Sequence, residues 1–252
     1  MAFMTVFGFI RRYAMRIFLM ASAVWMLAAC GAYIPHSVSM PMIDHKGALN
    51  ADAAFTSGSG YFAGQASAAY GFTDHLAAQV YVSNIPTTHL QGMVGSYWPL
   101  GSHFHVDAYG GYAHQWVDER YDDAADGSFM NFNGSHNIIF LQGDIGTTGR
   151  SKDWSDGLYF TGGLTMKVGC LLSDVTLTTP RYDDYGNHVG TNYDQLNSSC
   201  MLFEPSIQLG VGWGWISFNT RIGISFPSAM RGDSGLTLFP YTFGLGLSIR
   251  PF

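Results

Sequence analysis

Apolar and polar residues alternate with a period of two from Lys46 onward, and this pattern limits the possible folds more than any other feature. In the segment 76–84 one parity is apolar and the other is polar (Leu76, Ala78, Val80 and Val82 against Gln79, Tyr81 and Ser83). Successive side chains of a β-strand point to opposite faces, so such a segment predicts a strand with one apolar and one polar face.

The same alternation recurs along the chain and predicts an all-β, antiparallel protein of about ten strands. The segments are 47–55, 60–71, 76–84, 88–98, 103–117, 136–147, 157–170, 201–212, 215–226 and 236–250. An even number of strands is typical of single-chain bacterial barrels.

Alternation alone also fits a soluble β-sandwich, so composition matters here. Charged residues make up 12% of the chain and aromatic residues 15%, whereas an average soluble domain is about 25% charged. After the amino-terminal leader no hydrophobic run approaches the length of a spanning helix. An apolar surface that faces lipid would therefore be made of strands, and strands satisfy their backbone hydrogen bonds in hydrocarbon only in a closed barrel.

Connection lengths favour the barrel. The connections 72–75, 99–102 and 212–214 are short and 148–156 is intermediate, while 118–135 and 171–199 are long and polar and fall on the other side. This asymmetry is typical of an up-and-down outer-membrane β-barrel. The carboxyl terminus fits less well, because Phe252 has the opposite parity to Phe243 and the apolar residues after it. The sequence leaves open whether the barrel is membrane-integral.

The amino terminus predicts a lipoprotein signal peptide. Arg11, Arg12 and Arg16 precede an uncharged run that ends at Ala29, which is the order of a signal peptide and too short to span a membrane. Leu27 to Cys30 (LAAC) resembles the bacterial lipobox, whose cysteine receives a diacylglycerol carrying fatty acids such as palmitate. We therefore expect a signal peptide at 1–29, a lipid-anchored extended tether at 30–46 and a barrel domain at 47–252. The start codon, Met1 or Met15, stays open.

Several stretches resemble the small, mostly uncharacterised outer-membrane β-barrel lipoproteins of the Bacteroidetes. The stretches are Tyr33 to Pro35, Pro41 to Gly47, Ala69 to Leu76, Ile139 to Gly146 and Phe203 to Pro205. The resemblance implies a barrel fold and an outer-membrane location, with the lipid anchor at Cys30. It implies no catalytic residue.

Five charged residues fall on the polar parity of their predicted strands, namely Asp107, Asp144, Lys167, Glu204 and Arg221. In a barrel they would share one lumen, where buried charges require partners. They predict a charge network that plugs the lumen; the alternative is a path for solutes or ions.

Metal-binding and catalytic alternatives rest on histidines. His103 and His105 share one face of a strand, as metal ligands can, but the sequence offers no third ligand. His114, His136 and Ser135 lie near the predicted outer rim without a nucleophile motif or a base-orienting partner. We predict neither a metal nor a cofactor.

The remaining cysteines, Cys170 and Cys200, flank the second long connection. Antiparallel neighbours bring such positions opposite one another at distances that suit a disulfide, and the periplasm is oxidising. The sequence therefore predicts a Cys170–Cys200 bridge, with two unpaired thiols as the alternative.

The functional prediction is a non-enzymatic, lipid-anchored outer-membrane barrel with a structural or surface-binding role. Its partners would be membrane lipid and a glycan or protein bound through the long connections. Acidic residues outnumber basic ones by 18 to 12, which makes nucleic acid an improbable partner. A small-solute channel and a lipid-modifying enzyme are the alternatives.

Overall fold

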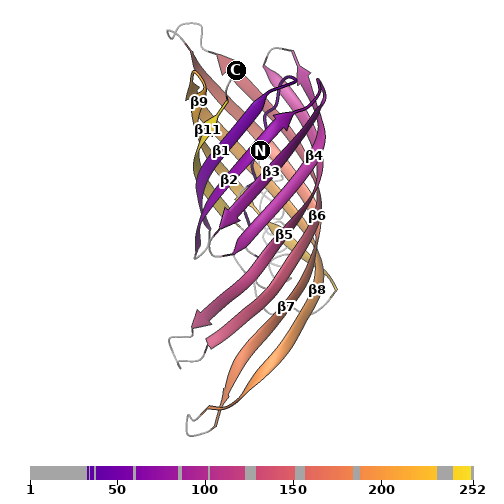
Figure 1. Ribbon diagram of the computed structural model, residues 1–252, viewed down its shortest axis with the longest axis vertical. Coiled ribbons are helices and arrows are strands. Elements are labelled where there is room, and N and C mark those ends of the chain that lie inside the picture. Colours follow the sequence, from indigo (N-terminus) through magenta and orange to yellow (C-terminus); the bar gives the residue numbers. More distant parts are fainter. Residues whose placement is uncertain are drawn as a thin grey trace, which may run out of the picture.

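A computed structural model describes residues 33, 35, 36, 38–58, 61–84, 87–101, 103–122, 129–150, 157–183, 188–231 and 241–250. The signal peptide and Cys30 lie outside these described residues. All regular structure within them is β-strand (Figure 1). The described ranges include no helix of the length and apolarity that crossing a membrane requires.

The strands form one antiparallel sheet that closes on itself. They are β1 (Leu49–Gly58), β2 (Tyr61–Gly71), β3 (Leu76–Asn84), β4 (Thr88–Leu100), β5 (Phe104–Asp122), β6 (Phe129–Arg150), β7 (Leu158–Tyr182), β8 (His188–Trp213), β9 (Ile216–Ile224), β10 (Phe226–Arg231) and β11 (Tyr241–Ile249). Each of β1 to β8 pairs with the next, and β8–β9, β9–β11 and β11–β1 pairs complete the ring.

β10 does not add a position to the ring. It follows β9 after Ser225 and pairs with the next part of β8, Ser199–Phe203. The barrel therefore has ten strand positions, and the all-β, antiparallel barrel predicted from the alternation is confirmed.

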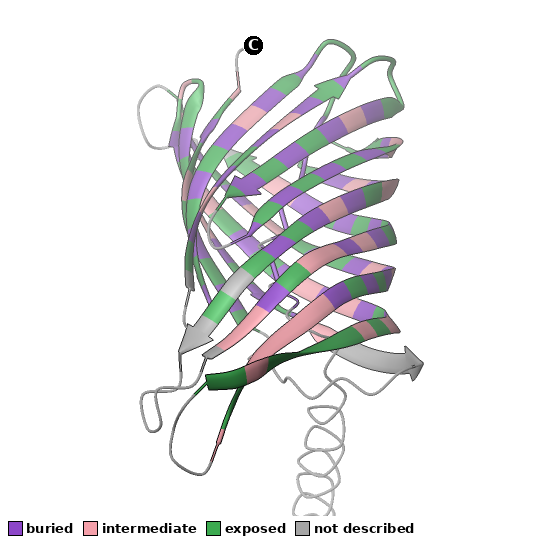
Figure 2. Ribbon diagram, turned by 60° about the horizontal axis from the view of Figure 1, so that its bottom comes forward, coloured by how far each residue is buried: buried purple, intermediate pink, exposed green. Residues whose placement is uncertain are grey.

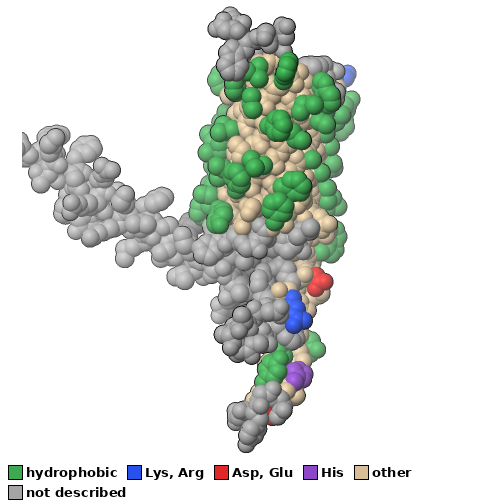
Figure 3. Space-filling model, turned by 90° about the vertical axis from the view of Figure 1, so that its left-hand side faces the viewer, with side chains coloured by type: hydrophobic (Ala, Val, Ile, Leu, Met, Phe, Trp, Pro, Cys, Tyr) green, Lys and Arg blue, Asp and Glu red, His purple; other side chains and the backbone are tan. Residues whose placement is uncertain are grey.

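The barrel wall is apolar outside and polar inside. On β6, Leu141 is 71% exposed while its neighbour Gln142 is 2% exposed, and buried and exposed residues alternate along the other strands (Figure 2). On the face seen in Figure 3, hydrophobic side chains lie all along the barrel body. A soluble β-sandwich would have the opposite arrangement.

The two long connections predicted at 118–135 and 171–199 are mostly strand, so that prediction is wrong. β4 pairs with β5 only as far as Trp116, and β10 pairs with β8 only from Ser199 onward. Beyond these points the β5–β6 and β7–β8 hairpins continue side by side as a four-stranded sheet (Figure 1). We call this sheet, residues 117–122, 129–134, 173–182 and 188–198, the hairpin extension.

The hairpin extension has a small apolar cluster of its own. Val117, Phe132 and Val175 are buried together, and Leu177 and Leu196 pack against them. The hairpin extension continues the sheet at one end of the barrel, so the molecule has a hairpin end and, opposite it, a short-turn end, where β1 begins and β11 finishes.

The segment expected to be a free tether lies inside the barrel instead. Met40 and Ile43 are each 1% exposed and Tyr33 is 5% exposed. Tyr33 and Ile43 belong to the same buried cluster as Tyr97, Tyr109 and Leu202 of the wall. The core of the protein therefore lies between this segment and the strands, within the lumen.

Candidate functional site

The lumen is filled by the amino-terminal segment 33–43, which we call the lumen strap. Its backbone is bound by side chains of the wall rather than by another strand. Gln208 Oε1 accepts from the Met40 amide (3.3 Å), Asn50 Nδ2 donates to the Pro41 carbonyl (2.7 Å) and Gln142 Nε2 donates to the Ser39 carbonyl (3.4 Å). Pro35 and Pro41 lack an amide hydrogen, which suits an extended segment without a strand partner.

Glycines in the wall make room for the strap. A Cβ at Gly163 would lie 2.1 Å from Met40 Cε, and a Cβ at Gly146 would lie 3.0 Å from Met40 Sδ. At Gly163 a side chain would displace Met40 and would also approach the Ile145 carbonyl oxygen (2.9 Å), whereas at Gly146 it would first meet the His105 ring (2.1 Å). The sequence of the wall is thus fitted to the strap.

Lys167 and Glu204 form one buried ion pair of the lumen. Their Nζ and Oε2 atoms are 3.1 Å apart, and both side chains are about 5% exposed or less. Lys167 also donates to Gln91 Oε1 (3.2 Å), while Tyr33 Oη (2.8 Å) and Ser225 Oγ (2.9 Å) donate to Glu204 Oε1. Through Tyr33 this pair also holds the strap.

Arg221 and Asp52 form the second ion pair, with 2.6 Å between Nη2 and Oδ2. Asn219 Nδ2 and Ser248 Oγ donate to the same carboxylate at 3.0 and 2.8 Å, and Arg221 Nε donates to Gln208 Oε1 at 3.1 Å. This cluster joins β1, β11, β9 and β8, where the first and last strands meet. Asp52 was missed from the sequence, although it lies on the polar parity of its strand.

Asp107 and Asp144 face each other across β5 and β6. Gln142 Nε2 donates to both oxygens of Asp144, at 3.2 and 3.0 Å. Within the described part of the chain no hydrogen bond reaches either oxygen of Asp107. All five charged residues expected in the lumen are thus buried there, but together with Asp52 they form two ion pairs and a carboxylate pair rather than one network.

Histidines line the lumen without forming a metal site. His36 of the strap packs 4.1 Å from His89, measured between ring centroids. His103 lies exposed at the short-turn end, where Nδ1 is 3.2 Å from the Thr148 carbonyl, while His105 is buried. Among the described residues no group of three or more His, Cys, Asp and Glu is arranged to hold a metal ion.

The barrel wall separates the residues considered for catalysis. His136 points into the lumen and contacts the Tyr33 ring, with 6.0 Å between centroids. His114 lies on the other face, where Nδ1 is 2.8 Å from Asn137 Oδ1 and the ring packs on Trp116. Ser135 has the outward parity opposite to His136. The three residues cannot act on one substrate atom.

The predicted Cys170–Cys200 disulfide is wrong. Cys170 is a free thiol, whereas Cys200 is disulfide-bonded, so the two are not bonded to each other. The register pairs Cys170 with Met201 and Leu171 with Cys200. A shift of one residue reverses the face, so Cys170 lies on the outer side of the wall and Cys200 on the inner side.

These contacts give a polar lumen whose wall side chains hold the strap. The strap occupies its axis, and the charges beside the strap are held by neighbouring side chains. The arrangement can hold the strap and stiffen the wall. The described side chains show no set of nucleophile, base and orienting partner.

No protein family matches the chain, and no curated protein does. Among solved structures the chain is similar to the N-terminal β-barrel domain of Pseudomonas aeruginosa OprF, with 10% identity and a TM-score of 0.30. That match covers 82% of this chain and 98% of the OprF domain. The chain is therefore characterised by its own architecture, a closed antiparallel barrel whose polar lumen holds its own amino-terminal segment.

Proposed function

We propose that the protein is a membrane-integral outer-membrane barrel with a non-enzymatic role, structural or in binding through its hairpin extension. The inverted polarity of the wall carries this proposal. Val94, Leu141 and Phe218 lie on different strands and are each 66% to 71% exposed. Soluble monomers rarely expose contiguous apolar patches larger than a few hundred Å², and a bilayer would cover this belt.

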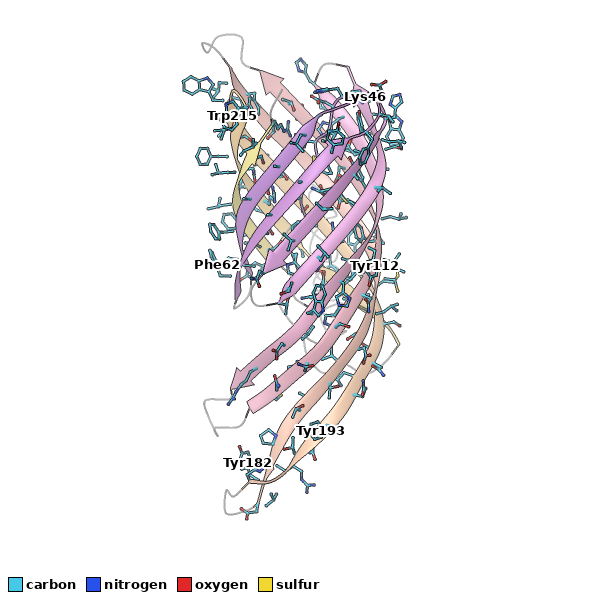
Figure 4. All side chains as sticks on the ribbon, in the orientation of Figure 1. Lys46, Phe62, Tyr112, Tyr182, Tyr193 and Trp215 are labelled. Atoms are coloured by element: carbon cyan, nitrogen blue, oxygen red, sulfur yellow. The ribbon has the colours of Figure 1, made fainter. Side chains whose placement is uncertain are left out.

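Aromatic residues at both ends of the belt support a membrane position. Trp213 and Trp215 lie exposed at the short-turn end, and Phe62 and Tyr112 lie at the hairpin end of the barrel body (Figure 4). Trp and Tyr prefer the interface between lipid and water. The hairpin extension, with Tyr182 and Tyr193, lies beyond the aromatic residues at the hairpin end of the barrel body (Figure 4).

Detergent dependence tests the membrane proposal. We expect a variant without residues 1–30 to require detergent or lipid to stay monodisperse, because the apolar belt would otherwise associate. Size-exclusion chromatography with light scattering measures this. A monodisperse species in plain buffer would contradict membrane integration.

The hairpin extension supports a surface-binding role. Its exposed residues are mostly uncharged and polar, with Val189 58% and Tyr193 72% exposed. An exposed tyrosine ring beside side-chain amide and hydroxyl groups can contact a glycan or a protein surface. Binding of purified surface glycans to the intact protein in detergent, compared with a Tyr193→Ala variant, tests this role.

A small-solute channel is the second candidate, because the lumen carries polar groups and charges of both signs. The strap lies in the lumen, where it would obstruct the passage of solutes. We therefore expect the full-length protein to be silent in planar bilayers, and steady conductance would favour the channel.

The lipid anchor is also a proposal, supported by the lipobox-like LAAC sequence at Leu27 to Cys30. A thiol in a disulfide cannot also carry a thioether-linked lipid. The chain has three cysteines and Cys170 is free. Within one chain, lipid attachment and a disulfide to Cys200 would therefore compete for Cys30. Mass spectrometry of non-reduced mature protein decides: a diacylated Cys30 peptide supports the anchor, and a peptide linking Cys30 to Cys200 overturns it.

A further inference from the structure

The lumen strap has a direction, which follows from its contacts along β6. This strand runs from Phe129 at the hairpin end to Arg150 at the short-turn end. Met40 packs at Gly146, the Ser39 carbonyl accepts from Gln142, and the Tyr33 ring lies against His136. Lower residue numbers of the strap therefore meet positions closer to the hairpin end.

Contacts with other strands give the same order. The residues that connect the strap to β1 lie at the short-turn end, where the Gly47 amide donates to the Gly71 carbonyl (2.8 Å). His36 lies by Tyr81 and His89 on β3 and β4, nearer the hairpin end than Gln79, which donates to Ser39 Oγ. The strap crosses the lumen rather than folding back within it.

The distance crossed is large compared with the chain that precedes Tyr33. Gly146 and His136 are separated along β6 by about 33 Å at 3.3 Å per residue, or roughly 25 Å along the axis of a barrel with tilted strands. Outward residues of β6 are apolar as far as Ile139 and polar from Asn137 toward the hairpins. Tyr33 therefore lies level with the hairpin-side edge of the apolar belt.

Cys30 is three residues before Tyr33, a span of at most about 10 Å. A return to the short-turn end needs more than twice that length. We infer that the mature chain threads its own barrel, so that Cys30, and any group it carries, lies on the hairpin side of the membrane. The assignment of Cys30 to one side of the membrane rests on the proposed membrane position. The threading of the strap through the barrel does not rest on it.

The inference changes the expected topology of the anchor. If the hairpin extension faces the outside of the cell, a lipid on Cys30 would enter the outer leaflet beside it. The sequence alone predicted residues 30–46 only as a lipid-anchored extended tether before the barrel.

Thiol labelling in intact bacteria tests the sidedness. In a Cys170→Ser background, a membrane-impermeant maleimide is applied to three variants of the full chain: Ala32→Cys, Val189→Cys on the hairpin extension and Asp44→Cys at the short-turn end. We expect Ala32→Cys and Val189→Cys to label in intact cells and Asp44→Cys only after lysis. The inference would be overturned if Ala32→Cys behaved like Asp44→Cys and labelled only after lysis, while Val189→Cys labelled in intact cells.

Cross-linking tests the threading without reference to the membrane. Oxidation should join Tyr33→Cys to His136→Cys, identified as a linked peptide, and should not join Tyr33→Cys to His105→Cys near the short-turn end. The reverse result would refute the threading. If the first pair forms while Val189→Cys and Asp44→Cys label alike, the membrane proposal fails and the threading stands.

Discussion

At the level of single residues, the ion pair of Arg221 and Asp52 shows how this barrel stabilises its seam. Both side chains are about 3% exposed or less, and the carboxylate accepts two further hydrogen bonds from Asn219 and Ser248. A buried pair is weak evidence of net stability, but the loss of one partner leaves an uncompensated charge.

We expect Arg221→Met to destabilise the barrel by about 3–5 kcal/mol, the usual cost of breaking a buried pair. The Asp52→Asn/Arg221→Met double variant should recover part of this loss, because no charge is then left alone. Urea unfolding in detergent micelles, followed by tryptophan fluorescence, measures both. Equal stability of the single variant and the wild type would show that the seam does not depend on the pair.

Among the elements, the strands of the barrel body were predictable and the strap and hairpins were not. One face of each barrel strand meets the apolar surroundings and the other meets the lumen, so each strand carries its own alternating pattern. The strap lies in a polar interior and pairs with no strand, so Ser39 and Met40 follow no period. The strand at 188–198 has polar residues on both faces and no regular alternation, and it pairs with β7 along its length.

The same reasoning explains the candidate site. Parity alone located Asp107, Asp144, Lys167, Glu204 and Arg221 in the lumen. It could not match Arg221 with Asp52, because the β1–β11–β9 register depends on ring closure. The disulfide prediction failed by a single residue of register between β7 and β8, a quantity that the loop sequence does not define.

Deletion of the strap, residues 33–43, should open the lumen. Removing Met40 and Tyr33 takes away their contacts with Gly163 and Glu204 and leaves polar side chains facing a vacated axis. We expect channel activity in planar bilayers that the full-length protein lacks. Resistance to unfolding in cold SDS would show that the deletion variant is folded. If such a folded variant gave no conductance, the wall side chains alone would close the barrel.

The hairpin extension should be separable from the barrel. Its residues lie beyond the last β4–β5 pair, Thr88–Trp116, and the last β8–β10 pair, Ser199–Arg231. We expect replacement of residues 175–196 by a short Asn-Gly turn to leave the barrel folded, with unchanged far-UV dichroism per strand residue and unchanged heat-modifiable migration on gels. Loss of the folded form would mean that the apolar cluster at Val117 and Phe132 is needed for closure.

For the whole molecule, the decisive property is which parts of its surface meet lipid. Leu141 on the barrel wall and Tyr193 on the hairpin extension are almost equally exposed, at 71% and 72%. Exposure alone would predict the same response to a charge at either position. Only a bilayer around the barrel body distinguishes them.

We expect Leu141→Arg to cost about 1–3 kcal/mol of folding free energy in lipid vesicles, between the cost of an arginine at the bilayer midplane and its cost near the interface. Tyr193→Arg should change it by less than about 0.5 kcal/mol, as a surface substitution in water does. Equilibrium unfolding from vesicles compares the two. Similar small effects at both positions would place the barrel outside the hydrocarbon.

A threaded strap also imposes an order of events on folding. The strap touches β3, β6 and β8 within a closed ring, so it lies among side chains of strands that surround it on several sides. The segment must be laid on the growing sheet before β1 meets β11. The closure of that last seam is then the step that traps the amino terminus, and afterwards the chain can be withdrawn only by opening the barrel.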